Sequence, residues 1–231
     1  SNDTGRILNK MRILGLDMSS KKSGYALLDN NELVDYGCWE IDVDTNKDWR
    51  KRILYMSKQL NDYFLLHNID KVYVEDVPPI TQNSQTVKVL SALQGCLMAI
   101  CEIHKVDVTF VPVTEWKNII KIDLSHSSEN KQKQKEFKAN KNTKGLTKLK
   151  DRVKAYEKKM SIDYANKYFN LNLQYVSPSS KKNQDDIADA INIAISKSIN
   201  KTTIYNIRTF NEIIQELSDD LKEDVFLGRL T

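Results

Sequence analysis

Acidic residues stand at the ends of apolar segments in this chain, where they could bind metal ions together. The apolar run "RILGLD" ends at Asp17, and the run "VYVE" ends at Glu75. A third segment, "DDIADAINIA", supplies Asp186 and Asp189 at the start of a helical pattern. Hard divalent cations prefer oxygen ligands, and carboxylates are the commonest of these. The four acids therefore favour metal-assisted hydrolysis of a phosphodiester as the first hypothesis.

The first two acids need neighbouring strands to bring them together. Residues 12–16, 24–28 and 32–36 are predicted to form strands joined by tight turns, and such strands run antiparallel. The segment Lys71–Glu75 follows a predicted helix over 48–67, so it pairs parallel to the first strand through a crossover. Ligands bind beyond the carboxyl ends of such strands. Asp17 and Glu75 are therefore expected in one crevice.

The other two acids belong to a predicted helix over 185–199. Asp186 and Asp189 are three residues apart, so they lie on neighbouring parts of one helical face. Acids are also common at helix starts because the helix dipole favours them there. That alternative leaves unexplained the small Ala188 and Ala190 beside Asp189, which would let the helix approach a sheet closely. Asp185 competes with Asp186, and spacing does not choose between them.

The order of predicted elements is typical of a ribonuclease-H-like α/β fold, with a mixed five-stranded sheet flanked by helices. The remaining elements are a strand over 106–111 and helices over 83–104, 116–120, 149–169 and 208–227. The predicted organisation is a nuclease domain over 11–200, interrupted by a basic insertion or loop over 121–150, and a C-terminal helical extension over 201–231.

The predicted helix 83–104 is apolar almost all round, so it needs cover on more than one face. We expect a homodimer through this helix, because one sheet cannot cover all of its apolar residues. The surplus surface is assigned to Leu90, Leu93, Leu97 and Ile100. The alternative is that the helix 208–227 folds back over that face and leaves a monomer.

Positive charge is concentrated in one segment of the chain. Residues 129–159 hold 12 Lys or Arg and 4 Asp or Glu, a net charge of +8, whereas the whole chain carries +4. Such local basicity is typical of polyanion binding. The alternative is a solvated lysine-rich loop without a partner. The predicted DNA-binding residues are Lys131, Lys133, Lys135, Lys138, Lys141 and Lys158.

The composition is that of a protein with a hydrophobic core, and it argues against a membrane protein or a disulfide-rich secreted protein. Hydrophobic residues make up 40% of the chain, enough for a core. No membrane span or secretory segment is predicted. The three cysteines show no disulfide pattern and the three histidines no zinc spacing, so a reducing, cytoplasmic compartment is expected.

Three motifs resemble the RuvC family of Holliday-junction resolvases and related phage nucleases. They are "ILGLDMSSKKSGYALL", "VYVEDVPP" and "DDIADAINIA". The resemblance implies an endodeoxyribonuclease that acts on branched DNA such as four-way junctions, in a bacterial or virus-infected cell. It places the catalytic, metal-binding acids at Asp17, Glu75, Asp186 and Asp189, which selects Asp186 over Asp185. It also implies two Mg²⁺ ions per site, with Mn²⁺ as a substitute, and products with a 5′ phosphate.

The family also has a catalytic lysine before its final helix, and the nearest matches are Lys158 and Lys159, with Lys159 preferred. The chain departs from the family in its long basic segment and in its tail after residue 200. Pro78 and Pro79 also occupy a region where such resolvases often carry an aromatic residue.

Three other hypotheses remain. An actin-like ATPase or sugar kinase shares the first acidic motif, but it needs two domains and more than the 7 glycines present. A ribonuclease H or transposase-like nuclease is the second, although ribonuclease H carries its second acid on a helix. The third is a non-catalytic protein that binds branched DNA.

Overall fold

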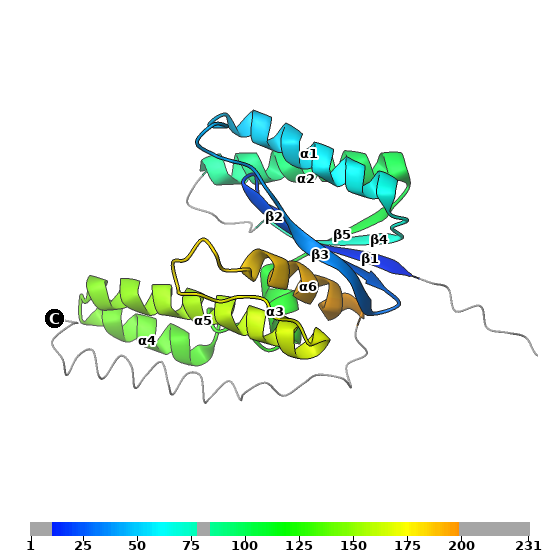
Figure 1. Cartoon of the computed structure of the whole chain (residues 1–231). Coiled ribbons are helices and arrows are strands. Elements are labelled where there is room, and N and C mark those ends of the chain that lie inside the picture. Colours follow the sequence, from blue (N-terminus) through cyan, green and yellow to red (C-terminus); the bar gives the residue numbers. More distant parts are fainter. Residues whose placement is uncertain (1–10, 78–83, 199–231) are drawn as a thin grey trace, which may run out of the picture.

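The computed structural model describes residues 11–77 and 84–198, and its centre is a mixed sheet (Figure 1). The strand order is β3-β2-β1-β4-β5. The first three strands are antiparallel neighbours, whereas β4 and β5 run parallel to β1. This is the predicted mixed five-stranded sheet. The strands are β1 (Arg12–Asp17), β2 (Lys22–Asp29), β3 (Glu32–Glu40), β4 (Lys71–Glu75) and β5 (Asp107–Val111).

A two-residue turn joins β2 to β3. Asn30 and Asn31 have φ angles of 51° and 70°, in the left-handed region that asparagine tolerates better than most residues. Turns with two such residues match the right-handed twist of paired strands. The sequence "DNN" therefore closes a hairpin, and the chain reaches the other side of β1 only after a crossover helix.

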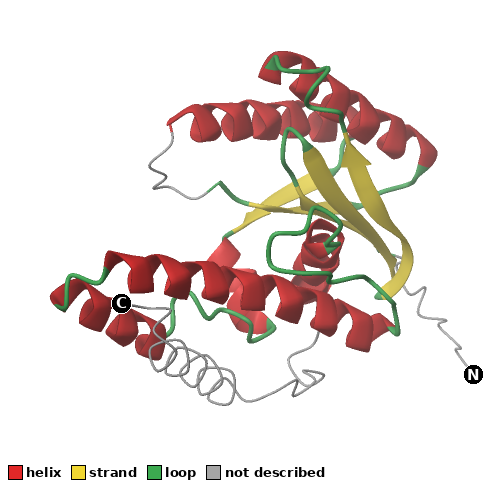
Figure 2. Ribbon diagram, turned by 60° about the vertical axis from the view of Figure 1, so that its left-hand side comes forward, coloured by secondary structure: helices red, strands yellow, loops and turns green. Residues whose placement is uncertain are grey.

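Helices cover both faces of the sheet (Figures 1 and 2). On one face α1 and α2 pack against each other, and on the other α6 lies along β1 and β2. The long α5 packs on α6, and α4 packs on α5. The bounds are α1 (Trp49–Leu66), α2 (Ser84–His104), α3 (Val113–Ile119), α4 (Ser128–Ala139), α5 (Thr143–Phe169) and α6 (Asp185–Ser198).

Two glycines let α6 approach the sheet closely. A Cβ atom on Gly15 would lie 2.2 Å from the Ala190 carbonyl oxygen, and one on Gly24 would lie 1.9 Å from the Asp186 carbonyl oxygen. Ala190 is fully buried at this contact. The small residues of both elements therefore seat the acidic end of α6 directly over β1 and β2.

Gly15→Ala is expected to lower the free energy of unfolding by about 1–3 kcal/mol or more, because backbone atoms of α6 must move to admit the methyl group. Gly95 in α2 is the matched control, since a Cβ there meets nothing within 4 Å. Gly95→Ala should raise stability by about 0.5–1 kcal/mol through helix propensity. Urea unfolding of both variants measures the difference. Equal effects would contradict the close contact of α6 with β1.

The basic segment 121–150, which was predicted to be an insertion or loop with some helical content, is largely helical. It contains α4 and the start of α5, which begins at Thr143 and not at Leu149. Ser127 caps α4 by accepting a hydrogen bond from the Asn130 backbone N–H, and Asn142 caps α5 in the same way. These caps and the packing of α4 on α5 make a helical hairpin of the lysine-rich sequence. The predicted extension 201–231, with its helix 208–227, lies outside the described residues.

The expected surplus surface of α2 is mostly buried within the protein. Leu93, Leu97 and Ile100 are 1%, 0% and 9% exposed because they pack in the core beneath α1 and against the sheet. The assignment of these three residues to a dimer surface was therefore wrong. By length and composition alone α2 could cross a membrane, but these contacts make it a core helix of the fold.

Candidate active site

Asp17 and Glu75 end two neighbouring strands at the same edge of the sheet. β1 and β4 are parallel, and Leu16 pairs with Val74, so the next residue of each strand is an acid. Both acids are partly buried. They line a small cavity of about 40 Å³ together with Met18, Asp76, Val77, Leu90, Leu93 and Gln94. The predicted crevice at the ends of these strands is therefore present.

The close seating of α6 brings its acids to the same place. Asp17 has its pKa raised well above the usual value, first by burial and then by the negative charges of Glu75, Asp189 and Asp186. Asp185 has the smallest effect of the four neighbouring acids. The charges of the other three predicted acids therefore all act on Asp17, and Asp186 acts on it more strongly than Asp185 does.

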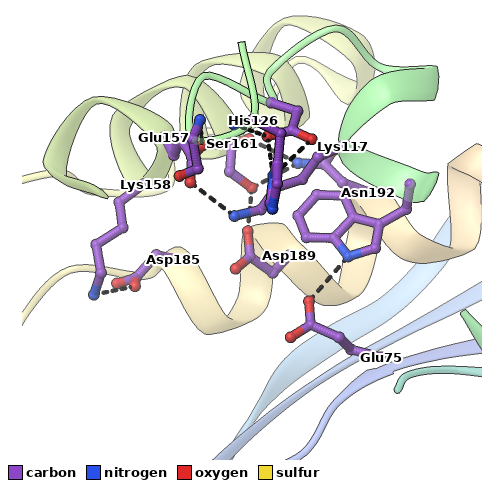
Figure 3. A network of polar contacts seen from close by, with 12 residues as sticks. Glu75, Lys117, His126, Glu157, Lys158, Ser161, Asp185, Asp189 and Asn192 are labelled. Atoms are coloured by element: carbon purple, nitrogen blue, oxygen red, sulfur yellow. Dashed lines mark hydrogen bonds and ion pairs between the residues drawn. The ribbon is translucent and has the colours of Figure 1, made fainter. Parts of the chain in front are cut away.

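Protein donors hold two of these carboxylates in place (Figure 3). The buried Trp116 of α3 donates from Nε1 to Glu75 Oε2 at 2.9 Å. The buried Ser161 of α5 donates its hydroxyl hydrogen to Asp189. Asn192 in turn donates to Ser161 Oγ at 2.8 Å. The orientation of the site therefore depends on three helices as well as the sheet.

Lysines engage the two acids at the start of α6. Lys22 Nζ lies 2.8 Å from Asp186 Oδ2, and Lys158 Nζ lies 2.6 Å from Asp185 Oδ2. Lys158 thus stands at the edge of the acidic site. Lys159 instead pairs with Asp163 on the exposed side of α5, at 3.0 Å. The geometry favours Lys158 over Lys159 as the lysine closer to the acids.

Lys117 is a cation of the site that sequence reasoning missed. Its Nζ atom lies 3.0 Å from Glu157 Oε2, and its side chain is only 19% exposed. Burial lowers the Lys117 pKa, but the charges of Glu157 and then Asp189 outweigh this effect and raise it. Lys117 directly follows Trp116, whose indole donates a hydrogen bond to Glu75. The sequence alone does not show that this pair of residues lies near the acids.

The donor set fits a divalent cation. Burial raises the pKa of Asp189 to about 7, despite the opposing effects of Lys117 and Ser161. Burial also raises the pKa of Glu75. The Asp17 carboxylate has no hydrogen bond or ion pair with any residue in the described part of the chain. Clustered carboxylates that lack sufficient positive charge gain stability when a cation binds among them.

The acids are not arranged as a metal-binding cluster in this structure. Within residues 11–77 and 84–198, no three Asp, Glu, His or Cys side chains are grouped closely enough to hold a metal ion. Asp186 is instead paired with Lys22, and Asp189 with Ser161. Binding of a metal by all four acids therefore requires rearrangement of side chains, with Asp186 exchanging its lysine partner.

The raised pKa of Asp189 predicts how the metal-free protein responds to pH. An aspartate has a pKa near 3.8 when unperturbed, whereas Asp189 has one of about 7 in the folded protein. The folded state therefore holds a proton more tightly, and stability is lost as pH rises from about 4 through about 7. In EDTA, urea unfolding should show a loss of a few kcal/mol across this window.

Asp189→Asn should reduce this pH dependence and be more stable than the wild type at pH 8, while the part that comes from the raised pKa values of Asp17 and Glu75 remains. Asp163→Asn is the matched control, because Asp163 is an exposed acid paired with Lys159. A wild-type slope retained by Asp189→Asn would show that Asp189 is not the group responsible.

Two resolvases are similar to this chain in sequence. No protein-family model matches the chain. The chain is 30% identical over 108 residues to crossover junction endodeoxyribonuclease RuvC of Campylobacter jejuni, covering 45% of this chain and 66% of that protein. It is 27% identical over 114 residues to the same enzyme of Campylobacter lari, covering 47% and 70%. The matches thus span about two thirds of the relatives' length.

A solved structure shares the fold. T. thermophilus RuvC in complex with a Holliday junction substrate superposes with a TM-score of 0.51 at 11% identity, covering 80% of this chain and 91% of that chain. The mixed sheet and its flanking helices have the ribonuclease-H-like α/β fold. In sequence the chain is similar to the two RuvC resolvases, and in fold it is similar to T. thermophilus RuvC.

Proposed function

We propose that the protein is a metal-dependent endodeoxyribonuclease that cleaves Holliday junctions or related branched DNA. The observation that carries this proposal is the position of Asp17 and Glu75 at the ends of neighbouring strands, with Asp189 and Asp186 of α6 near enough to raise the pKa of Asp17. Matches to two crossover junction endodeoxyribonucleases support the substrate class. The four acids are proposed as the catalytic, metal-binding residues.

The residues of the site have different proposed roles in phosphodiester hydrolysis. Two Mg²⁺ ions, or Mn²⁺ in their place, bound by the four acids would supply an activated water and neutralise charge on the leaving 3′ oxygen. Trp116 and Ser161 hold Glu75 and Asp189 in position. Lys117 offsets negative charge between these two acids from within the protein. Lys158 lies at the edge, where a lysine can contact a phosphate of the substrate.

The lysine-rich hairpin of α4 and α5 is the proposed grip on the DNA backbone. It projects beyond the sheet on the side where β1 and β4 end (Figure 1). Lys131, Lys135 and Lys138 are exposed at spacings of four and three residues, so they share one face of α4. Lys141 is exposed in the turn that follows, whereas Lys133 is partly buried. Contacts with phosphates position DNA without reading its sequence.

A cleavage assay tests the function directly. The purified chain with Mg²⁺ should cut a four-way junction, leave matched linear duplex intact and show no preference for an RNA–DNA hybrid. Products with a 5′ phosphate are expected. Preferential cutting of the hybrid would favour a ribonuclease H, and binding without cutting under Mg²⁺ and Mn²⁺ would favour a non-catalytic protein.

A homodimer would supply two active sites for the two matched cuts that a junction needs. The apolar side chains available for it are not those predicted. They lie at the carboxyl ends of α1 and α2, where the rings of Phe64 and His104 are 5.2 Å apart. Leu65 and Leu66 are 69% and 79% exposed, and Ile103 is 74% exposed.

Leu66→Glu combined with Ile103→Glu is therefore expected to convert a dimer into a monomer, because buried carboxylates oppose association. Sedimentation equilibrium at micromolar concentration checks this, with the exposed polar change Lys58→Glu as a control. A wild-type chain that sediments as a single species near 26.7 kDa would exclude the dimer.

A further inference from the structure

A second cavity lies beside the acidic site. It is open, measures about 550 Å³, and is formed by the turn after β1, the segment before α1 and the first turns of α2. Leu90 lines both this cavity and the small cavity that contains Asp17 and Glu75. The amino-terminal ends of α1 and α2 lie on the side of the sheet where β1 and β4 end (Figure 1). The two cavities are therefore neighbours.

A buried arginine shapes this second cavity, which we call the Trp49 groove. Arg52 is 8% exposed and donates from Nη1 to the carbonyl oxygens of Asn46 at 2.9 Å and Lys47 at 2.7 Å. Its Nε donates to Ser20 Oγ at 3.4 Å. These bonds tie the segment before α1 to the turn after β1, so the groove is formed before any ligand binds.

The Trp49 groove carries positive charge that has no carboxylate partner. Arg52 makes no ion pair with any residue in the described part of the chain, although buried charges are normally paired. The same holds for Lys21 and Lys47, which are exposed and also line the groove. Three cations without a carboxylate partner among the described residues complement an anionic ligand.

An aromatic wall completes the groove. Trp49 is partly exposed, and its indole also packs beside the buried Val89. Arg50 Cζ lies 4.6 Å from the ring centroid, and Lys88 Nζ lies 5.9 Å from it. Packing alone would account for the tryptophan but not for the cations around it. An indole combined with cations is the arrangement that binds a base and its phosphate in single-stranded DNA.

We propose that the Trp49 groove binds an unpaired nucleotide of the DNA strand next to the scissile phosphate. The base contacts Trp49, and the phosphates contact Lys21 and Lys47. The positive charge of the buried Arg52 attracts the phosphates from beneath the groove surface. This inference rests on the proposed nuclease function, because Leu90 lines both cavities and the groove therefore adjoins the acidic site. The groove would select DNA in which bases are unstacked, as they are at a branch point, over uninterrupted duplex.

The test compares binding of unpaired and paired DNA by the full chain in EDTA, where no cleavage occurs. Fluorescence anisotropy is measured with labelled oligothymidylate and with a matched duplex. Trp49→Ala should weaken binding of oligothymidylate by about 5- to 150-fold and change duplex binding by less than about twofold. Trp49→Phe, which keeps an aromatic ring, should retain most of the affinity and guards against a folding defect in the alanine variant.

Lys21→Gln combined with Lys47→Gln should lower the log–log salt slope for oligothymidylate by about 0.7 for each phosphate that is no longer bound. Lys58→Gln, on α1 outside the groove, is the control and should leave the slope unchanged. Equal binding of oligothymidylate by Trp49→Ala and wild type would overturn the proposal. Parallel weakening on duplex and oligothymidylate by Trp49→Ala and Trp49→Phe would also overturn it, because it indicates a packing role.

Failure of the Trp49 groove proposal can be distinguished from failure of the proposed nuclease function. A wild-type chain that cuts junctions while Trp49→Ala binds unpaired DNA normally would reject the groove alone. A wild-type chain that cuts no branched DNA would reject the proposed function, and the binding comparison would still report on the groove.

Discussion

Asp17→Asn and Asp189→Asn are each expected to abolish DNA cleavage while junction binding survives or strengthens. Each substitution removes one proposed metal-binding carboxylate from the acidic site and keeps the size of the side chain. Loss of about 4 kcal/mol of transition-state stabilisation corresponds to a rate about a thousandfold lower. Binding survives because the proposed phosphate-binding lysines lie elsewhere, on α4 and α5.

The metal-free fold should tolerate both substitutions. Asp17 is opposed by the charges of Glu75, Asp189 and Asp186, so removing one negative charge relieves repulsion. Single-turnover cleavage of a labelled four-way junction with Mg²⁺ measures the rate, and gel mobility in EDTA measures binding. Asp163→Asn, an exposed acid on α5, should cleave as the wild type does. A near wild-type rate for Asp17→Asn or Asp189→Asn would show that the acids are wrongly assigned.

Replacing the hairpin lysines by glutamine is expected to weaken binding of DNA of any sequence. The set is Lys131, Lys133, Lys135, Lys138 and Lys141. Each lysine that no longer binds a phosphate should lower the log–log salt slope by about 0.9, because fewer counterions are released from duplex DNA. If all five lysines bind phosphates in the wild type, the slope should fall by about 4 to 5.

The structure sharpens this experiment. Lys131, Lys135 and Lys138 share an exposed face, so their triple replacement should account for most of the change, and Lys133→Gln alone for little. Lys58→Gln combined with Lys105→Gln removes two positive charges outside the hairpin and controls for net charge. Binding is titrated by anisotropy at several salt concentrations. An unchanged slope for the five-lysine variant would show that the hairpin is a solvated surface.

The sequence by itself determined the strands, most helices and the four candidate acids. Local patterns suffice for these features: the buried run Ile13–Leu16 specifies a strand, "DNN" specifies a hairpin, and the small residues around Asp189 indicate close packing. Parallel pairing of β1 with β4 follows from the intervening helix. The acids could therefore be placed in one crevice before any tertiary contact was known.

Helix formation in the basic segment was harder to predict. Lysine-rich sequences gain little from burying apolar surface on their own. Here the segment is ordered through contacts distant from its charged face: Phe137 packs over Gly145, where a Cβ would lie 2.4 Å from its ring, and Leu149 is buried in the core. Sparse contacts of this kind do not produce a strong periodic signal.

Only the tertiary structure decided which side chains serve the site from other elements. Lys117 and Ser161 are distant in sequence from Asp189, and each is brought to it by the packing of α3 and α5 around α6. Tertiary packing also decided which face of α2 is covered, because α1 takes up Leu93 and leaves Ile103 exposed. The spacing of apolar residues in the sequence indicates which side chains are buried. It does not indicate which side chain each of them packs against, because those contacts form between helices that are distant in sequence.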